Sequence, residues 1–119
     1  MSLHFEDHGL VLIARARDAE IGADNAPDLR LQMMKHVQPE HYLAVDLSPV
    51  TFMDSSGLSF LVALLKRVRD IGACRVFGVQ PRVLELFRLT RLDKVFTIDP
   101  NEETAVAMLE ESARRSKSA

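Results

Sequence analysis

Short runs of aliphatic residues recur along the chain and are separated by polar segments. The four longer runs contain β-branched residues and are bounded by Gly, Pro or polar residues, which is typical of buried strands, and Leu3–Phe5 is expected to form a shorter strand before them. The strands predicted in this way are Leu3–Phe5, Leu10–Ala14, Tyr42–Leu47, Cys74–Val79 and Val95–Ile98. A turn is expected near Glu6–Gly9, between the first two.

Between the second and third of these runs the apolar spacing becomes helical. Asn25 is suited to be the N-cap of a helix, and Pro27 fits its first turn. The helix is expected to run to about His36. Its apolar face carries Leu29, Met33 and Val37.

A longer helix is predicted from Asp54–Gly57 to about Ile71, with Gly72 just past its end. The stripe facing the core consists of Leu58, Leu61, Leu65 and Val68. Phe60 and Leu64 form an i, i+4 apolar pair on the opposite side. Either one or both are buried in the core, or they form an exposed patch on which a partner helix packs.

Two further helices complete the prediction. One runs from Arg82 to about Thr90, and the last follows Asp99, with Asp99 or Asn101 as its cap. Residues 1–113 are expected to form one domain, and residues 114–119 a basic disordered tail. The resulting order, β-β-α-β-α-β-α-β-α, predicts an α/β fold with a mixed sheet of four to five strands and about four helices.

Composition narrows the function classes. The chain has 119 residues, 47% hydrophobic and 27% charged, with a net charge of −2 and one cysteine. The near-neutral charge argues against a nucleic-acid binder that relies on bulk positive charge. One cysteine excludes an intramolecular disulfide framework. The apolar runs are too short to span a membrane, and no signal-peptide core is present, so a soluble cytoplasmic domain without direct membrane insertion is expected.

The sequence offers few candidate residues or motifs for enzymatic chemistry. Cys74 lies in a predicted strand, where a lone cysteine is interpreted as a buried apolar residue rather than a nucleophile. The four histidines, which lack the spacing of a zinc site, are interpreted as solvated; they are His4, His8, His36 and His41. Glycine-rich phosphate loops and the G-x-S-x-G motif are absent. We therefore expect no catalytic residue, metal or cofactor, with nucleotide binding kept as one alternative.

The segment Phe52–Leu58 stands out. Asp54 and the two serines after it fit a helix N-cap, but a second serine exceeds what a cap needs. Gly57 costs about 1 kcal/mol of helix propensity relative to Ala and permits close approach of another surface. A serine hydroxyl at a helix N-terminus is also well placed to accept a phosphoryl group, because the helix end tolerates anions.

In its surroundings this segment resembles the signature of the STAS domain, the sulphate transporter and anti-sigma factor antagonist family. The resemblance covers about residues 8–110. It is carried by Asn25–Leu29, Val45–Leu58, Gly78–Phe87 and Thr90–Phe96.

The resemblance implies a bacterial, cytoplasmic anti-sigma factor antagonist that is not an enzyme. In its unphosphorylated form it would bind an anti-sigma factor that is also a serine kinase, and so free a sigma factor. Ser56 would be the phosphorylated residue, and a serine phosphatase would reverse the change. Asp54, Ser55 and Gly57 would lie at the binding surface. A monomer or weak dimer is expected.

One departure concerns the segment before the first helix. The family often has an acidic residue at the position of Gly22, whereas Glu20 matches the family pattern. Glu20 is therefore an expected partner-binding residue, and Phe60 and Leu64 are added to it from the helix pattern. If the family's acid contacts the kinase, Gly22 implies a partner different from the standard one. The alternative function is a STAS subunit of a lipid-transport or stress-sensing complex that acts as a protein-interaction module.

Overall fold

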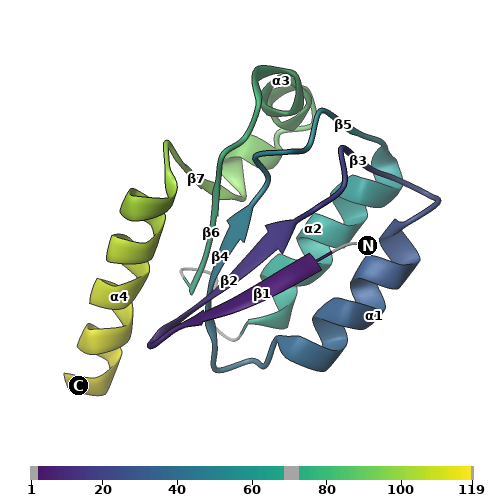
Figure 1. Cartoon of the computed structure of the whole chain (residues 1–119). Coiled ribbons are helices and arrows are strands. Elements are labelled where there is room, and N and C mark those ends of the chain that lie inside the picture. The colour runs from purple at the N-terminus through teal and green to yellow at the C-terminus, as the bar shows by residue number, and fades with distance from the viewer. Residues whose placement is uncertain (1–2, 69–72, 119) are drawn as a thin grey trace.

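The computed structural model describes residues 3–68 and 73–118, and builds them into a five-stranded sheet with helices on both faces (Figure 1). The elements are β1 (Leu3–His8), β2 (Val11–Ala16), β3 (Glu20–Ile21), α1 (Ala26–His36), β4 (Tyr42–Asp46), β5 (Phe52–Met53), α2 (Ser55–Arg67), β6 (Cys74–Phe77), α3 (Pro81–Leu89), the 3₁₀ helix η2 (Leu92–Lys94), β7 (Thr97–Asp99) and α4 (Glu102–Ser118).

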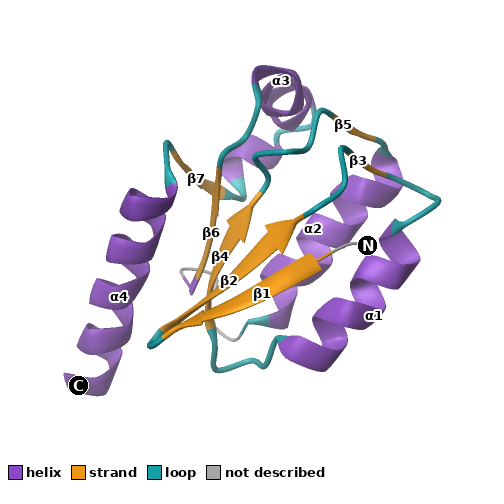
Figure 2. Ribbon diagram, in the orientation of Figure 1, coloured by secondary structure: helices purple, strands orange, loops and turns teal. Residues whose placement is uncertain are grey.

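The main sheet has the order β1-β2-β4-β6-β7. β1 pairs antiparallel with β2, and the other neighbours are parallel, so the sheet is mixed (Figure 2). The predicted α/β fold and its element order are confirmed. The structure adds a second, two-stranded ladder in which β3 pairs parallel with β5. Strands of two residues leave too little periodicity to be predicted from sequence.

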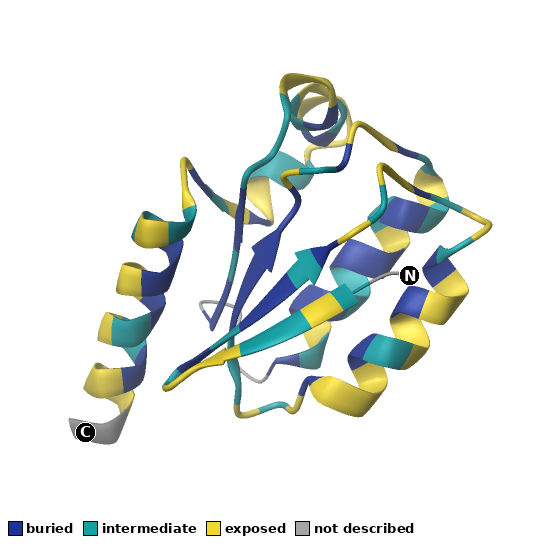
Figure 3. Ribbon diagram, viewed as in Figure 1, coloured by how far each residue is buried: buried dark blue, intermediate teal, exposed yellow. Residues whose placement is uncertain are grey.

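The hydrophobic cores on the two faces of the sheet differ in size. α1 and α2 cover one face, where strand residues such as Ala14, Leu43 and Val45 join a large core. α4 covers the other face, where Val11 and Ile13 contact a smaller core formed with Ala44, Phe77, Ala105, Val106 and Leu109 (Figure 3). Successive residues of β2 alternate between these cores, because strand side chains point to opposite faces.

The smaller face is supplemented by ion pairs. Arg15 of β2 donates to Glu6 at 2.7 Å, to the buried Asp46 at 3.0 Å and to Glu102 at 2.8 Å. The pKa of Arg15 is raised, chiefly by its hydrogen bonds to Glu6 and Glu102. One guanidinium group therefore links β1, β4 and the first turn of α4.

Asp99 and Asn101 were the two predicted caps of the last helix, and a second arginine, Arg75, binds the first of them. Asp99 is buried and accepts two hydrogen bonds from Arg75, at 2.7 and 3.0 Å. It is thus the ion-pair partner of a neighbouring strand and not the cap of α4. Asn101 is the cap, because its Oδ1 accepts the N–H of Thr104 at 2.9 Å.

Several boundaries differ from the sequence prediction. β1 continues to His8, so the turn lies later than expected, around Gly9 at φ +70°. α2 ends at Arg67 instead of near Ile71; the expected end at Ile71 and Gly72 lies outside the described residues. α4 continues to Ser118, so residues 114–118 extend the helix where a disordered tail was expected.

Candidate functional site

The N-terminus of α2 is organised by one carboxylate. Asp54 is its N-cap, and Oδ1 accepts the N–H groups of Ser56 at 2.8 Å and Gly57 at 3.1 Å. Oδ2 accepts the N–H of Ala23 at 3.1 Å, from the loop before α1. These hydrogen bonds, first of all the one from Gly57, lower the pKa of Asp54 below its usual range. The expected cap is present, and it also ties α2 to a distant loop.

Gly57 lets α2 approach β3. A Cβ atom built on Gly57 would overlap the backbone carbonyl oxygen of Ile21. The same carbonyl accepts the N–H of Asp54 at 3.3 Å. The glycine in the first turn of α2 is therefore required by packing against β3, which is the close approach expected from the sequence.

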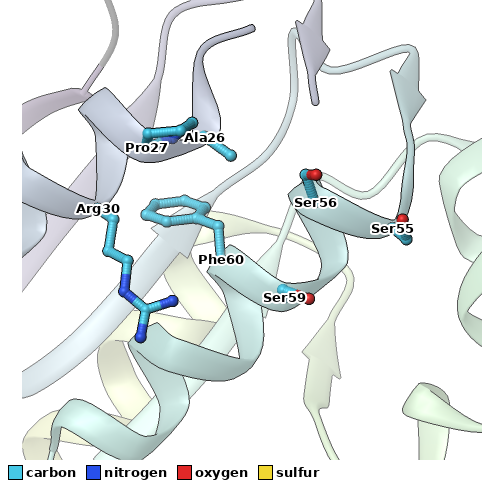
Figure 4. Close-up of a pocket in the computed structure, with 7 residues that line it drawn as sticks. All are labelled: Ala26, Pro27, Arg30, Ser55, Ser56, Ser59 and Phe60. Atoms are coloured by element: carbon cyan, nitrogen blue, oxygen red, sulfur yellow. The ribbon is translucent and has the colours of Figure 1, made fainter. Parts of the chain in front are cut away.

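Three serine hydroxyl groups lie around a hollow between the starts of α1 and α2. Ser55 and Ser59 are exposed and Ser56 is half-buried. The hollow has a volume of about 320 Å³ and is completed by Ala26, Pro27, Arg30 and Phe60 (Figure 4). Ser56 thus sits at an accessible edge of the molecule, on a rigidly capped helix turn.

Most of the backbone donors at this helix end already have acceptors. The first four N–H groups of a helix have no partner within it. Here Asp54 N–H donates to Ile21, and those of Ser56 and Gly57 donate to Asp54. An anion attached to Ser56 would therefore find few free N–H groups. This differs from the expectation that open helix donors would accommodate it.

Glu20 borders a different hollow from the three serines. It is exposed on β3 and lines a second hollow of about 390 Å³ with Asp24, Phe52 and Asp54. Gly22 forms part of the same wall, and a Cβ atom there would lie 2.7 Å from Asp54 Oδ2. The structure thus brings Glu20 to the same helix end as Asp54. It also explains the glycine that departs from the family pattern, because a side chain at Gly22 would crowd the capping carboxylate.

Of the two alternatives for Phe60 and Leu64, burial in the core is confirmed, and the exposed partner-binding patch is wrong. Both side chains belong to the large core, with exposed fractions of 2% and 1%. α2 packs against α1 as well as against the sheet, so its buried face is broader than the single stripe. That face contains Phe60, Leu61, Leu64 and Leu65, whereas Leu58 is only partly buried. Phe60 reaches the site only as the floor of the serine hollow.

The other candidate residues lie away from this site. Cys74 is buried on β6, and burial raises the pKa of its thiol to about 12, which fits a packing role. His4, His8 and His36 are exposed, and His36 stacks on Phe5. In residues 3–68 and 73–118 no group of three His, Cys, Asp or Glu side chains could hold a metal ion. No helix among the described residues is long and apolar enough to cross a membrane.

Two residues at the site were not singled out from the sequence. Phe52 is half-exposed beside Glu20 and Asp24, and Arg30 of α1 lines the serine hollow. Phe52 lies two residues before Asp54, and the adjacent apolar residue, Met53, is buried, so the sequence did not indicate which of the two is exposed. Arg30 carried no signal either, because one arginine on an amphipathic helix is normally a solvated residue.

Comparison with known proteins agrees with this geometry. A curated relative, an anti-sigma F factor antagonist from Paenibacillus polymyxa, is 30% identical over 92% of this chain and 96% of its own length. An anti-sigma-B factor antagonist from Listeria monocytogenes is 32% identical over 77% of this chain and 79% of its own. The crystal structure of an anti-sigma factor antagonist from Mycobacterium paratuberculosis superposes with a TM-score of 0.81 at 28% identity. That match covers 92% of this chain and 93% of the crystallised one.

The family follows from a match over most of the chain. Residues 5–105 match the sequence profile of the STAS domain. The mixed five-stranded sheet with its helices is the fold of the structural relatives. The chain therefore belongs to the STAS domain family.

Proposed function

We propose that this protein is an anti-sigma factor antagonist. In its unphosphorylated form it binds an anti-sigma factor serine kinase in the cytoplasm and so releases a sigma factor for transcription. The kinase transfers the γ-phosphoryl group of ATP to the Ser56 hydroxyl, ADP leaves, and the hydroxyl proton passes to a base on the kinase. A serine phosphatase later hydrolyses the phosphoserine. The similarity to curated antagonists over most of the chain supports this proposal.

The single observation that carries the proposal is the position of Ser56. Its side chain borders an open hollow, while its backbone N–H is held by Asp54 at 2.8 Å. A hydroxyl in this place is accessible to a kinase, and the chain around it is fixed by the cap and by Gly57. Ser55 and Ser59 border the same hollow, so the choice of Ser56 among them is the part of the proposal that phosphosite mapping tests.

Electrostatics explains why phosphorylation would release the partner. A phosphoserine carries a charge of about −1.5 to −2 at neutral pH. At Ser56 this charge would join Asp54, and most nearby N–H groups already have acceptors. The added charge would thus face a docked partner with little compensation from its own helix. Like charges brought together across an interface cost several kcal/mol, and each 1.4 kcal/mol weakens binding tenfold.

The test uses three variants and one purified partner. The partner is the anti-sigma factor that the wild-type protein captures from its source cells, produced recombinantly. We expect Ser56→Asp to bind it at least about a hundredfold more weakly, and Ser56→Ala to bind normally. Ser116→Asp adds the same charge at an exposed position on α4 and should bind normally. Incubation with ATP should phosphorylate Ser56, and neither Ser55 nor Ser59, by mass spectrometry.

Two results would contradict the proposal. Equal affinity of Ser56→Asp and wild type would exclude the switch. Capture of a transport ATPase or a stress-sensing assembly without any anti-sigma factor would replace the antagonist function with the interaction-module alternative.

A further inference from the structure

Two elements beside the site expose large apolar side chains toward one groove. Phe52 of β5 is 50% exposed, and Leu89 at the end of α3 is 77% exposed. Leu86, one turn before Leu89 on α3, is partly buried and lines the same groove. The groove has a volume of about 250 Å³ and runs between β5 and α3, which lie next to each other in Figure 1. Exposed apolar groups that gather in a groove mark an interaction surface more often than single exposed residues do.

The groove continues into the acidic hollow through a shared side chain. Phe52 lines both, with Leu86 and Leu89 on one side and Glu20 and Asp24 on the other. Both oxygens of Asp54 are occupied by backbone N–H groups. Among the residues that the structure describes, the carboxylates of Glu20 and Asp24 have no ion-pair partner. The surface therefore has an apolar part and, directly beside it, two uncompensated negative charges.

The charges on this surface indicate which side chains a bound partner would place on it. Two free carboxylates next to an apolar groove are complementary to a basic residue next to an aliphatic one. The groove itself contains one charge of each sign, from Arg82 and Glu85, so it adds no net charge. β5 leads directly into Asp54 and α2, which places the groove in the same continuous segment as Ser56.

We propose that the groove between β5 and α3 is the apolar part of the surface that the anti-sigma factor occupies. The partner inserts an aliphatic side chain between Phe52 and Leu89 and directs an adjacent basic side chain toward Glu20 and Asp24. This inference rests on the proposed function and adds to it a binding surface that is separate from the modified serine.

With this surface, the interface has one part that supplies affinity and another part that regulates binding. Buried aromatic and aliphatic contacts supply most of the affinity of a typical interface, and a few residues dominate it. The charge at Ser56 then decides whether the complex forms, without taking part in the apolar contact. Truncating Phe52 should therefore weaken binding in both phosphorylation states of the serine, whereas Ser56→Asp acts only through charge.

The experiment measures affinity by titration calorimetry with the same purified anti-sigma factor. We expect Phe52→Ala and Leu89→Glu each to weaken binding by at least about tenfold. Met108→Glu, which places a charge at a 43%-exposed apolar position on α4, should leave binding within about twofold of wild type. None of these three side chains belongs to the buried core, so all three variants should stay folded, and their melting temperatures are measured beside the affinities. Glu20→Lys should weaken binding, which tests the acidic part of the surface.

The outcomes separate this inference from the proposed function. If wild type binds an anti-sigma factor and Phe52→Ala and Leu89→Glu bind it equally well, the groove is not part of the interface, while the proposed function stands. The same conclusion follows if these variants change self-association alone, since the occupant would then be a second copy of the chain. If wild type binds no anti-sigma factor, the proposed function fails and this inference fails with it.

Discussion

The starts of α1 and α2 lie beside each other but are closed in different ways. α2 depends on a side chain, because Asp54 accepts the N–H groups of Ser56 and Gly57. α1 has Asn25 at the same position, yet Asn25 makes no side-chain cap. The carbonyl of Gly22 instead accepts the N–H groups of Asn25 and Ala26, at 3.2 and 2.8 Å.

The side chain of Asn25 is used elsewhere. Its Oδ1 accepts the N–H of Gly22 at 2.9 Å, and its Nδ2 donates to the carbonyl of Glu20 at 2.8 Å and to Asp18 at 3.2 Å. Asp54 and Asn25 are both residues that often cap helices, but Asp54 caps α2 whereas Asn25 stabilises the loop before α1. The comparison teaches that the charged, titratable helix start is the one beside Ser56, whereas the start of α1 is closed by neutral backbone groups.

The largest effect is expected at Phe60, which lies between the two starts. Phe60→Asp would bury a charge in the core, because the side chain is 2% exposed. We expect the free energy of unfolding to fall by about 4 kcal/mol or more, or the protein to misfold. Denaturant unfolding measures this, with Phe60→Leu as the milder control. A variant that melts like wild type would mean that Phe60 is not part of the packing between α1 and α2.

The next effect tests the contact between α2 and β3. Gly57→Ala would push a methyl group into the carbonyl of Ile21, which is backbone and cannot rotate away. We expect a loss of about 3 kcal/mol, although alanine improves helix propensity. Thermal unfolding gives the measurement, and Ser59→Ala, at an exposed position of the same helix, is the matched control. Stabilisation of Gly57→Ala would contradict the close approach.

A smaller, pH-dependent effect distinguishes the two starts directly. The pKa of Asp54 is lower in the folded protein than in the unfolded chain, where it is about 3.9. Its contribution to stability is therefore complete above that value and is lost as the pH falls through the lower folded pKa. Asp54→Asn keeps a capping oxygen but removes the titration, so the melting temperature should fall less steeply below pH 4 than in wild type. Equal slopes would show that Asp54 is not the titrating cap.

The smallest effect concerns the loop before α1. Asn25→Ala removes three hydrogen bonds from partly exposed groups and should cost about 1 kcal/mol. The loss should be independent of pH between about 6 and 8, because the amide does not titrate and carboxylates keep their charge over that range. Asn25→Asp keeps the acceptor for Gly22 but turns a charged oxygen toward the Glu20 carbonyl and the Asp18 carboxylate, so chemical denaturation should place it at or below Asn25→Ala. A slope against pH in Asn25→Ala would mean that both starts depend on charge.

The sequence predicted the buried face of a helix correctly where a single stripe of apolar residues describes that face. Leu29, Met33 and Val37 were expected on one face of the first helix and are all buried. The pattern left burial and exposure as alternatives at Phe60 and Leu64, because α2 has two neighbours and a single stripe describes only one. It left Asp99 and Asn101 as alternative caps of the last helix, because no local signal reveals that Arg75, partly buried on the neighbouring strand, pairs with the Asp99 carboxylate.

The same limit applies to the site. Asp54 and Gly57 were predicted because capping and close approach leave local marks in the sequence. The link from Asp54 to Ala23 and the contact of Gly57 with Ile21 depend on the short β3–β5 ladder, which joins segments far apart in the chain. The groove at Phe52 also needs α3 beside β5, and this was not visible before the fold was known.

The guanidinium of Arg15, which joins β1, β4 and α4, has a consequence for how the molecule opens. α4 shares only a small apolar core with the sheet, and much of its attachment at the N-terminal end is ionic. Ion pairs with partly exposed groups weaken in concentrated salt, whereas the large core under α1 and α2 does not depend on them. In native-state hydrogen exchange, α4 is therefore the element that would open as a separate unit as ionic strength rises, while the amides of α2 stay protected to the global limit. The helix that bears the serine would keep its shape through fluctuations that release the C-terminal end of the chain.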